Sequence, residues 1–158
     1  MSLNESDLPD RLNQSDDPAD RLAEASARVM WQEDSASRGL GMRLISIHAG
    51  QACLQMTVRD DMVNGHGICH GGFQFLLADS AFAFSCNSRN QRCVAASAEV
   101  HFLAPARAGD LLTAVATEVH RAGRSGVYDI RVTNQRDELI AVFRGKSATI
   151  AGQLVESS

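Results

Sequence analysis

The longest apolar stretch of the chain predicts its central helix. Nearly every residue between Phe73 and Phe84 is Phe, Leu or Ala, and Ala and Leu favour a helix. A helix that is apolar on all its faces is buried on all sides. The stretch is too short and too interrupted to span a membrane, which needs roughly 20 apolar residues in a row. We therefore expect residues 73–84 to form the central helix of a soluble domain.

Alternating apolar residues before this helix predict a β-hairpin. Residues 42–48 and 51–58 flank a tight turn at Ala49-Gly50, and every second residue of the second segment is apolar. A period of two is typical of a strand with one buried face. The residues expected on that face are Ala52, Leu54, Met56 and Val58.

Further strands are expected after the helix, separated by short turns. They cover residues 94–103, 111–120, 125–134 and 139–150. In the first of these strands, alternate residues from Val94 to Phe102 should pack on the helix, so Ser97 should face away from it. Two strands, a helix and four strands predict an α+β fold with one antiparallel sheet of about six strands.

The two ends of the chain are expected to lie outside this domain. Residues 1–20 are polar and acidic, and such a segment cannot bury enough apolar surface to become ordered. We predict a flexible tail at 1–20, one domain at 21–152 and a C-terminal tail at 153–158.

A short amphipathic helix is expected from Pro18 to Asp34. Asp17 is a suitable N-cap, and proline is favoured at the first helical position. The expected apolar side of this helix carries Leu22, Val29 and Met30.

Composition and charge exclude some classes of function. The 158 residues suit one domain, and the hydrophobic fraction of 44% and charged fraction of 22% are ordinary for a globular protein. The net charge of −4 argues against nucleic-acid binding, which needs a basic patch. The sequence shows neither a secretory signal nor a membrane span, so the cytoplasm is the expected location.

The cysteine and histidine spacings give no metal or redox motif. Cysteines occur at positions 53, 69, 86 and 93, which match neither a zinc ribbon nor a redox pair. His66, Cys69 and His70 lie close together, but their setting is glycine-rich and lacks a second pair of ligands. We therefore expect no metal and no other cofactor.

One acidic residue interrupts the apolar helix. The residues three and four positions from Asp79 are all apolar. A carboxylate among them costs free energy unless it is paired, hydrogen-bonded or used in chemistry. Asp79 is therefore a candidate catalytic group. The alternatives are a satisfied buried aspartate and an aspartate at a polar seam between subunits.

The start of the helix also carries candidate chemistry. Gly71 and Gly72 leave the first backbone N–H groups unshielded, and these groups form the positive end of the helix dipole. Such groups can polarise a carbonyl oxygen. Asp79 lies about 12 Å further along the helix axis, so one helix cannot easily bring both groups to one atom. Two copies side by side in a dimer could do so.

These motifs resemble those of hotdog-fold thioesterases of the phenylacetic-acid-degradation type. The resemblance runs from about residue 36 to about residue 151, and its helix motif is specific. The residues that carry it are Asn64-Gly65-His66, His70-Gly71-Gly72, Leu77-Ala78-Asp79, Ala83 and Cys86-Asn87-Ser88.

The resemblance implies a fold, an assembly and catalytic positions. In that family a long helix lies in a curved antiparallel sheet, and two subunits pair edge to edge into a homodimer and, frequently, a homotetramer. The family's catalytic acid matches Asp79, its asparagine before the helix matches Asn64, and its His-Gly matches His70 and Gly71. A serine or threonine in the strand after the helix matches Ser97. No matching position departs from the pattern.

The implied reaction is hydrolysis of an acyl-CoA thioester. The Gly71 N–H would bind the thioester oxygen, Asn64 and His70 would orient the loop and substrate, and Ser97 would help to hold a water molecule. Asp79 of the facing subunit would act as general base or nucleophile. The family points to an aryl-acetyl group, such as phenylacetyl or hydroxyphenylacetyl.

Substrate contacts are expected at both ends of the acyl-CoA. Aromatic side chains suit an aryl group, although packing in a protein core is the more common reason for them. Basic side chains suit the CoA phosphates, although they are equally typical of a solvated surface. The expected substrate-binding residues are Gly72, Phe73, Phe75, Leu76, Arg121, Arg124, Arg144 and Lys146.

Two alternatives remain open at this point. A hydratase or dehydratase on the same scaffold would need an acid–base pair, usually Asp with His in one motif, whereas the nearest His to Asp79 is nine residues earlier. A non-catalytic acyl-CoA binding or regulatory module would more naturally lack the acid. Assays with crotonyl-type substrates, or binding without turnover, would separate these interpretations.

Overall fold

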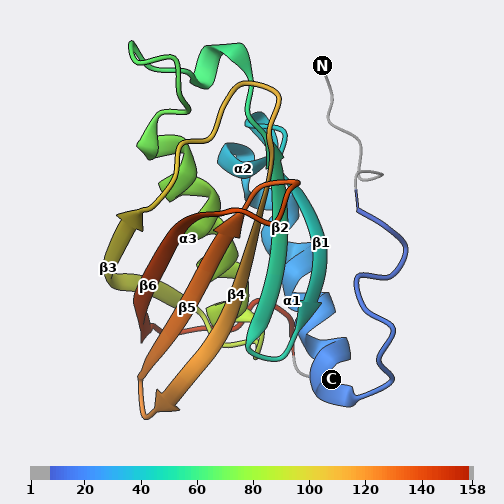
Figure 1. Cartoon of the computed structure of the whole chain (residues 1–158). Coiled ribbons are helices and arrows are strands. Elements are labelled where there is room, and N and C mark those ends of the chain that lie inside the picture. Colours follow the sequence, from blue (N-terminus) through green and yellow to red (C-terminus); the bar gives the residue numbers. More distant parts are fainter. Residues whose placement is uncertain (1–7, 157–158) are drawn as a thin grey trace.

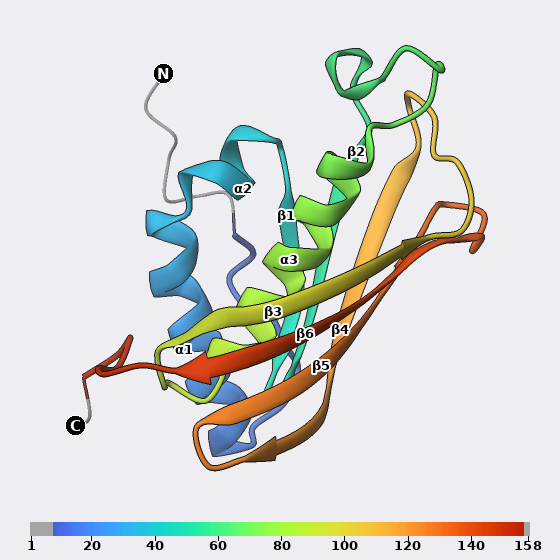
Figure 2. The same ribbon diagram turned by 90° about the vertical axis from the view of Figure 1, so that its left-hand side faces the viewer.

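One long helix lies along the concave face of a six-stranded antiparallel sheet (Figures 1 and 2). The computed structural model describes residues 8–156. The helix is α3 (Gly71–Asn87), and the strand order is β1-β2-β4-β5-β6-β3. The strands are β1 (Arg43–His48), β2 (Gln51–Thr57), β3 (Cys93–Phe102), β4 (Leu111–Ala122), β5 (Ser125–Thr133) and β6 (Leu139–Thr149). The predicted α+β fold with an antiparallel sheet is confirmed.

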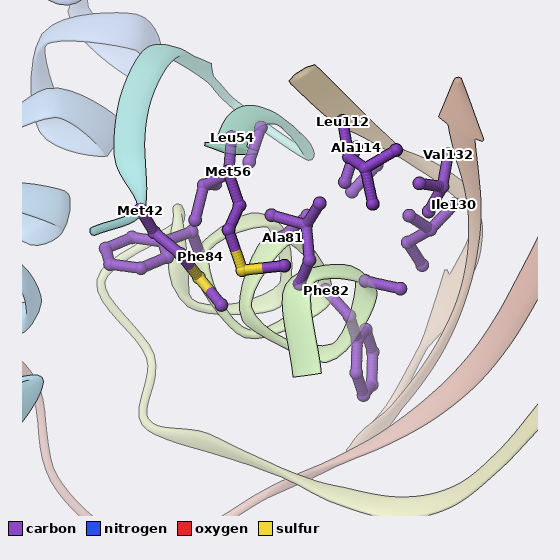
Figure 3. Close-up of a cluster of buried hydrophobic side chains, with 14 of the residues drawn as sticks. Met42, Leu54, Met56, Ala81, Phe82, Phe84, Leu112, Ala114, Ile130 and Val132 are labelled. Carbon is purple, nitrogen blue, oxygen red and sulfur yellow. The ribbon is translucent and has the colours of Figure 1, made fainter. Parts of the chain in front are cut away.

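Burial of α3 against the sheet forms the core (Figure 3). Phe82 and Phe84 of α3 are each 1% exposed, and the predicted inner face of β2 is buried along its whole length. The Phe82 ring lies directly against the backbone of Gly145 on β6, because a Cβ there would lie only 2.8 Å from the ring. A larger residue at position 145 would push the aromatic core away from the sheet.

β3 departs from its prediction because it is an edge strand. It pairs only with β6, and a bulge between Ala95 and Ser97 shifts its register. The expectation that alternate residues from Val94 to Phe102 pack on the helix is wrong for most of them. Val94, Ala96 and Ala98 are exposed, and Val100 packs partly against the core. Phe102 is 52% exposed, although its ring lies over the helix start at Gly71. Nothing within residues 8–156 covers this edge.

The first helix forms as predicted but buries a different face. In α1 (Pro18–Glu33), the Asp17 side chain accepts a hydrogen bond from the Ala19 N–H at 2.8 Å, which confirms the N-cap. The predicted apolar side is wrong for Leu22, which is 39% exposed, whereas Met30 packs partly buried against the core as expected. The fully buried residues are three small ones, Ala23, Ser26 and Ala27, and the large Trp31. A second, short helix, α2 (Ser35–Gly39), follows.

Part of the expected N-terminal tail is packed against the domain. Leu12 is only 2% exposed, and its carbonyl accepts a hydrogen bond from the Ile47 N–H at 3.3 Å. The Asn13 amide donates to the Ile47 carbonyl at 3.1 Å. The prediction that residues 1–20 cannot become ordered is therefore wrong for this segment. Burial of Leu12 and hydrogen bonds to Ile47 hold it against the domain without a large apolar surface. Residues 1–7 of that prediction lie outside the described residues.

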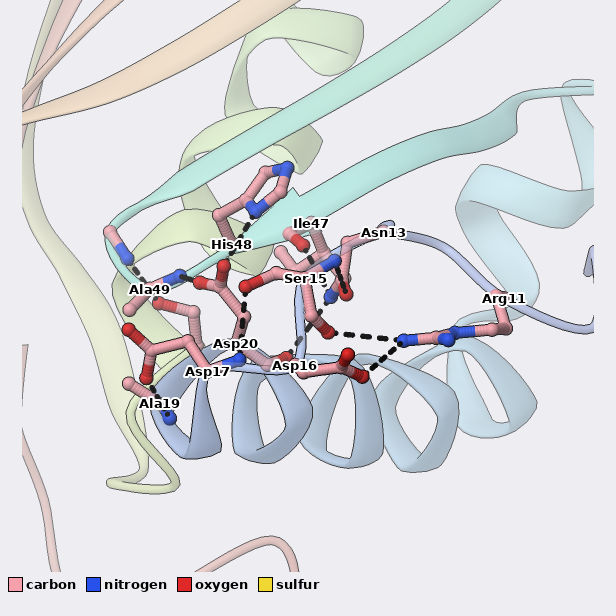
Figure 4. Close-up of polar contacts among 12 residues, drawn as sticks. Arg11, Asn13, Ser15, Asp16, Asp17, Ala19, Asp20, Ile47, His48 and Ala49 are labelled. Atoms are coloured by element: carbon pink, nitrogen blue, oxygen red, sulfur yellow. Dashed lines mark hydrogen bonds and ion pairs between the residues drawn. The ribbon is translucent and has the colours of Figure 1, made fainter.

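A cluster around Asp20 fastens α1 to the β1–β2 turn (Figure 4). The Asp20 carboxylate accepts hydrogen bonds from the His48 ring at 2.9 Å and from the Ala49 N–H at 3.0 Å. These bonds, that to His48 first, lower the pKa of Asp20 to about 2. The folded state therefore binds this proton more weakly than the unfolded chain does.

We expect Asp20→Asn to destabilise the protein in a pH-dependent way. Above pH 4 the charged carboxylate should contribute about 1–2 kcal/mol, after allowance for solvent screening. This difference between wild type and variant should shrink as pH falls from 4 towards 2, because the folded state then takes up the proton. Urea unfolding at several pH values measures it. Asp16→Asn, at an exposed ion pair with Arg11, is the control, and a pH-independent difference for Asp20→Asn would contradict the prediction.

Candidate active site

Polar side chains on two different sides of α3 fix its rotation. The Ser80 hydroxyl lies 2.9 Å from that of Ser37 on α2, and the Ser85 hydroxyl donates to the Gly50 carbonyl at 2.9 Å. Both serines are buried. These bonds hold the sides of α3 that point away from Asp79. The stripe that carries Phe75, Leu76 and Asp79 is therefore left only partly covered.

Asp79 is a half-buried carboxyl group without a compensating partner. No hydrogen bond or ion pair of its side chain occurs among residues 8–156, and desolvation by burial raises its pKa above the ordinary value of an aspartate. Its flanking side chains are apolar, and the Phe75 ring packs edge-on against Phe143 at 5.2 Å. The energetically unfavourable carboxylate that the sequence indicated is therefore present in the folded protomer.

His70 caps the start of α3 and orders the backbone there. Its Nδ1 accepts a hydrogen bond from the Gly72 N–H at 3.0 Å, so the ring proton of the neutral histidine is on Nε2. Gly71 is the first helical residue. Its N–H has no acceptor in the part of the chain that the structure describes, and it is thus free to bind a ligand oxygen.

A cavity of about 480 Å³ opens beside this helix start. Asn64 and Gly71 both line it, together with the chain that leaves β3. The side-chain oxygen of Asn64, Oδ1, accepts a hydrogen bond from the His66 backbone N–H at 2.9 Å. The side-chain NH₂ group of Asn64 is therefore left for a ligand. Phe102 covers Gly71 so closely that a Cβ would lie 2.9 Å from the ring.

Gln74 is a residue of this cavity that the sequence analysis missed. It lines the cavity, is 4% exposed and donates to the Cys69 carbonyl at 3.4 Å. Its Oε1 atom is buried without a hydrogen bond among the described residues. The signal was available, because Gln74 is a second polar residue within the apolar helix run.

The protomer brings only part of the predicted site together. Asp79 is not among the residues that line the cavity at Gly71. Ser97 is exposed on β3, opposite Lys146 of β6. Phe73 and Leu76 are partly buried against the core, and Gly72 is exposed.

The four basic residues do not form one patch. Arg144 is bound to the Asp129 carboxylate by two bonds of 2.6 and 2.7 Å. Arg121 donates to the side chain of Gln91, and Arg124 donates to the Thr149 carbonyl at 2.9 Å. Lys146 has neither an ion pair nor a hydrogen bond of its side chain within residues 8–156. Arg144 is therefore the least available of the four for a phosphate.

Within the described residues, no group of three or more His, Cys, Asp or Glu side chains is arranged to hold a metal ion. No helix in that part of the chain is long and apolar enough to cross a membrane.

Comparison with known proteins identifies the fold and the class of enzyme. A model of the thioesterase superfamily matches residues 66–141. The acyl-coenzyme A thioesterase PaaI of Escherichia coli K12 is 45% identical over 129 residues, covering 82% of this chain and 92% of that protein. The solved structure of E. coli PaaI, from the phenylacetic acid degradation operon, has a TM-score of 0.84 at 44% identity, covering 85% of this chain and 98% of its own.

A variant of the phenylacetic acid degradation protein PaaI of Thermus thermophilus is also similar. Its solved structure has a TM-score of 0.72 at 34% identity, covering 74% of this chain and all of its own. The fold is the hotdog fold, and the protein is an enzyme that hydrolyses thioesters. The chain belongs to the thioesterase superfamily, and the resemblance to its phenylacetic-acid-degradation type is confirmed.

We expect Asp79→Asn to stabilise the fold at neutral pH. A raised folded-state pKa means that the ionised carboxylate weakens folding above that pKa, and a neutral isostere removes this effect. The gain in unfolding free energy should vanish below about pH 4, where Asp79 is protonated in both the folded and the unfolded state. Urea unfolding at about pH 7 and about pH 3.5 measures this. A variant less stable than wild type at neutral pH would mean that the carboxylate has a stabilising partner.

Proposed function

We propose that the enzyme hydrolyses acyl-CoA thioesters to the free acid and CoA at a site shared by two subunits. The observation that carries this proposal is the pair of unsatisfied groups on α3, the Gly71 N–H and the Asp79 carboxylate. The names of the E. coli and T. thermophilus relatives support the substrate class.

The proposed chemistry divides between the two groups. The Gly71 N–H, at the positive end of the helix dipole, binds the thioester oxygen and stabilises the negative charge that develops on it. Asp79 takes a proton from water, whose oxygen adds to the carbonyl carbon, or attacks that carbon directly. The C–S bond then breaks and CoA leaves as a thiolate. In the direct route the acyl group remains on Asp79 as an anhydride, which a water molecule then hydrolyses to the free acid and the Asp79 carboxylate. Asn64 and His70 orient the loop and substrate, and Ser97 helps to hold the water.

Two features support a shared site. Asp79 lies about 12 Å along the axis from Gly71, so a second helix is needed to bring a carboxylate to the same carbonyl. β3 is an edge strand with exposed apolar residues at its end, among them Phe102 and Leu103, and such edges are usually covered. A second subunit that pairs along β3 would cover them, and a tetramer would form from two such dimers.

The acyl group and CoA are proposed to bind on either side of the reacting carbonyl. The residues that would contact an aryl-acetyl group are Phe73, Phe75 and Leu76. Arg121, Arg124 and Lys146 would contact phosphates, whereas Arg144 would first have to leave Asp129. We expect the enzyme in the reducing cytoplasm, consistent with four free cysteines.

Thiol release from a panel of acyl-CoAs tests the reaction and the substrate class. We expect aryl-acetyl CoA to be turned over faster than short or long straight-chain thioesters. Asp79→Asn should lower kcat by at least about 100-fold. Wild-type activity should fall in acid with a midpoint above the ordinary aspartate pKa. CoA binding without turnover of any thioester would instead favour a binding module.

Gly71→Pro tests the oxyanion role of one N–H. Proline is favoured at the first helical position, and the His70 backbone, at φ −59° and ψ 132°, suits a residue before proline. Removal of the N–H should lower kcat by about 10²- to 10³-fold. Gly71→Ala, which also crowds Phe102 but keeps the N–H, is the matched control. Equal losses in both variants would exclude the N–H as the oxyanion donor.

Mixing the two inactive variants tests whether the site is shared. If Gly71 and Asp79 act from different subunits, Gly71→Pro and Asp79→Asn chains refolded together should recover about a quarter of wild-type activity. About half of the dimers then contain both variants, and each of these has one intact site. No recovery, with mixed dimers shown by native mass spectrometry, would place both groups in one subunit.

A further inference from the structure

The ring of Phe102 lies against the start of α3. A Cβ atom added to Gly71 would come within 2.9 Å of the Cζ atom of this ring, and within 3.2 and 3.3 Å of its two Cε atoms. The outer edge of the ring therefore points at the helix start. Gly71 is accordingly half-buried, whereas Gly72 beside it is exposed. Only a residue without a side chain leaves room for the ring at this position.

The backbone around Phe102 holds the ring in place. Phe102 is the last residue of β3, and the N–H groups of the next two residues both donate to the Ile140 carbonyl, at 2.8 and 3.2 Å. The Ala106 carbonyl then accepts a hydrogen bond from the Cys69 N–H at 2.8 Å, which ties this segment to the chain just before α3. The contact between the ring and the helix start is therefore built into the fold.

Phe102 contributes little to the stability of the core. It is 52% exposed, whereas Phe82 and Phe84 are each 1% exposed. Because burial stabilises in proportion to the apolar area removed from water, Phe102 adds less to the fold than these core rings do. Its removal should therefore change the surroundings of Gly71 without unfolding the domain.

The ring lies beside a backbone N–H that is free to bind a ligand. The Gly72 N–H donates to the His70 ring at 3.0 Å, and the Phe73 N–H donates to the His70 carbonyl at 3.0 Å. The Gly71 N–H, in contrast, has no acceptor among residues 8–156. Phe102 thus stands next to the donor that we propose for the thioester oxygen.

The cavity of about 480 Å³ at this point has largely apolar walls. Besides Phe102, its apolar lining consists of Ile68, Cys69, Leu103, Ala104 and Pro105. A hydrogen bond from an N–H to a developing oxyanion is stronger where water is excluded, because the local dielectric constant is low. The Phe102 ring supplies an apolar wall directly beside the donor.

We propose that Phe102 is a substrate-contacting residue of the thioester hydrolysis. Its ring forms the wall on which the bound thioester lies, and it keeps water from the Gly71 N–H. The N–H then stabilises the oxyanion more strongly than it would in contact with solvent. This role rests on the proposed function of Gly71 and adds an aromatic ring from the end of β3 to that site.

The same contact gives position 71 a need for glycine, although its proposed role uses only the backbone. Gly71→Ala keeps the N–H, but the new Cβ would collide with the edge of the Phe102 ring. The collision displaces the ring and admits water to the donor. Gly71→Ala and Phe102→Ala should therefore slow the reaction through one shared cause.

Thiol release from phenylacetyl-CoA by the full-length protein tests this role. Phe102→Ala should lower kcat by about 10-fold, which is less than the loss of about 10²- to 10³-fold expected when the donor itself is removed. KM should change less than kcat, because the shielding acts mainly on the charge of the transition state. Phe102→Leu, which keeps an apolar side chain, should lose less activity than Phe102→Ala.

Val94→Ala is the matched control. Val94 is also an exposed apolar residue of β3, but it lies at the other end of the strand. Its kcat should remain within about twofold of the wild type, as is usual for surface substitutions. Native mass spectrometry should show the same assembly for Phe102→Ala as for the wild type, and a loss of activity that merely follows dissociation of the subunits would overturn the proposal.

A double-variant cycle separates shielding from a general structural effect. If both changes act by removing the ring from the donor, the variant with Gly71→Ala and Phe102→Ala together should be no slower than Phe102→Ala alone. Losses that multiply in the double variant, or a kcat of Phe102→Ala within about twofold of the wild type, would each overturn the proposal. If Phe102→Ala does not fold, Gly71→Ala and Phe102→Leu decide the result, and wild-type kcat in both would overturn it.

Failure of this role can be told apart from failure of the proposed reaction. A wild-type enzyme that hydrolyses no thioester would remove the reaction and the role of Phe102 with it. Turnover that is lost in Asp79→Asn but retained in Phe102→Ala would overturn the role of Phe102 alone.

Discussion

Enclosure of a largely apolar helix by a curved sheet is the constraint on which the rest of the structure depends. α3 contacts every strand of the sheet as well as α1 and α2, so its sequence must be apolar and its rotation must be fixed. Gly145 allows the sheet to approach Phe82. Ser80 and Ser85 supply directional bonds that apolar packing lacks. Because these contacts fix the helix, the single partly open stripe that carries Asp79 has a definite position.

The unsatisfied polar groups discussed above gather on this same helix. The Asp79 carboxylate, the Gly71 N–H and the buried Oε1 of Gln74 all lack partners among residues 8–156. Asp20, a carboxylate on α1, shows the opposite case, because His48 and Ala49 satisfy it. A group that must act on a ligand cannot also be satisfied by its own chain, so stability is lower where chemistry is proposed.

The edge strand β3 borders the proposed shared site. Its far end, at Phe102, covers the Gly71 helix start. A bulge between Ala95 and Ser97 shifts its register against β6. An uncovered edge with exposed apolar residues suits pairing with a second subunit, so a subunit that pairs along β3 would lie beside the helix start.

The sequence by itself determined the central helix, the strands and the position of the unusual carboxylate. Local periodicity was sufficient for β2, where alternate apolar residues are buried, and local capping chemistry was sufficient for Asp17. Only the tertiary structure decided that β3 is exposed and that Leu12 is buried. A hydrophobic pattern records which residues are suited to burial, but which element covers them depends on contacts between distant parts of the chain. The separation of Asp79 from Gly71, by contrast, follows from the rise of one helix, and Asp79 is accordingly not among the residues that line the Gly71 cavity.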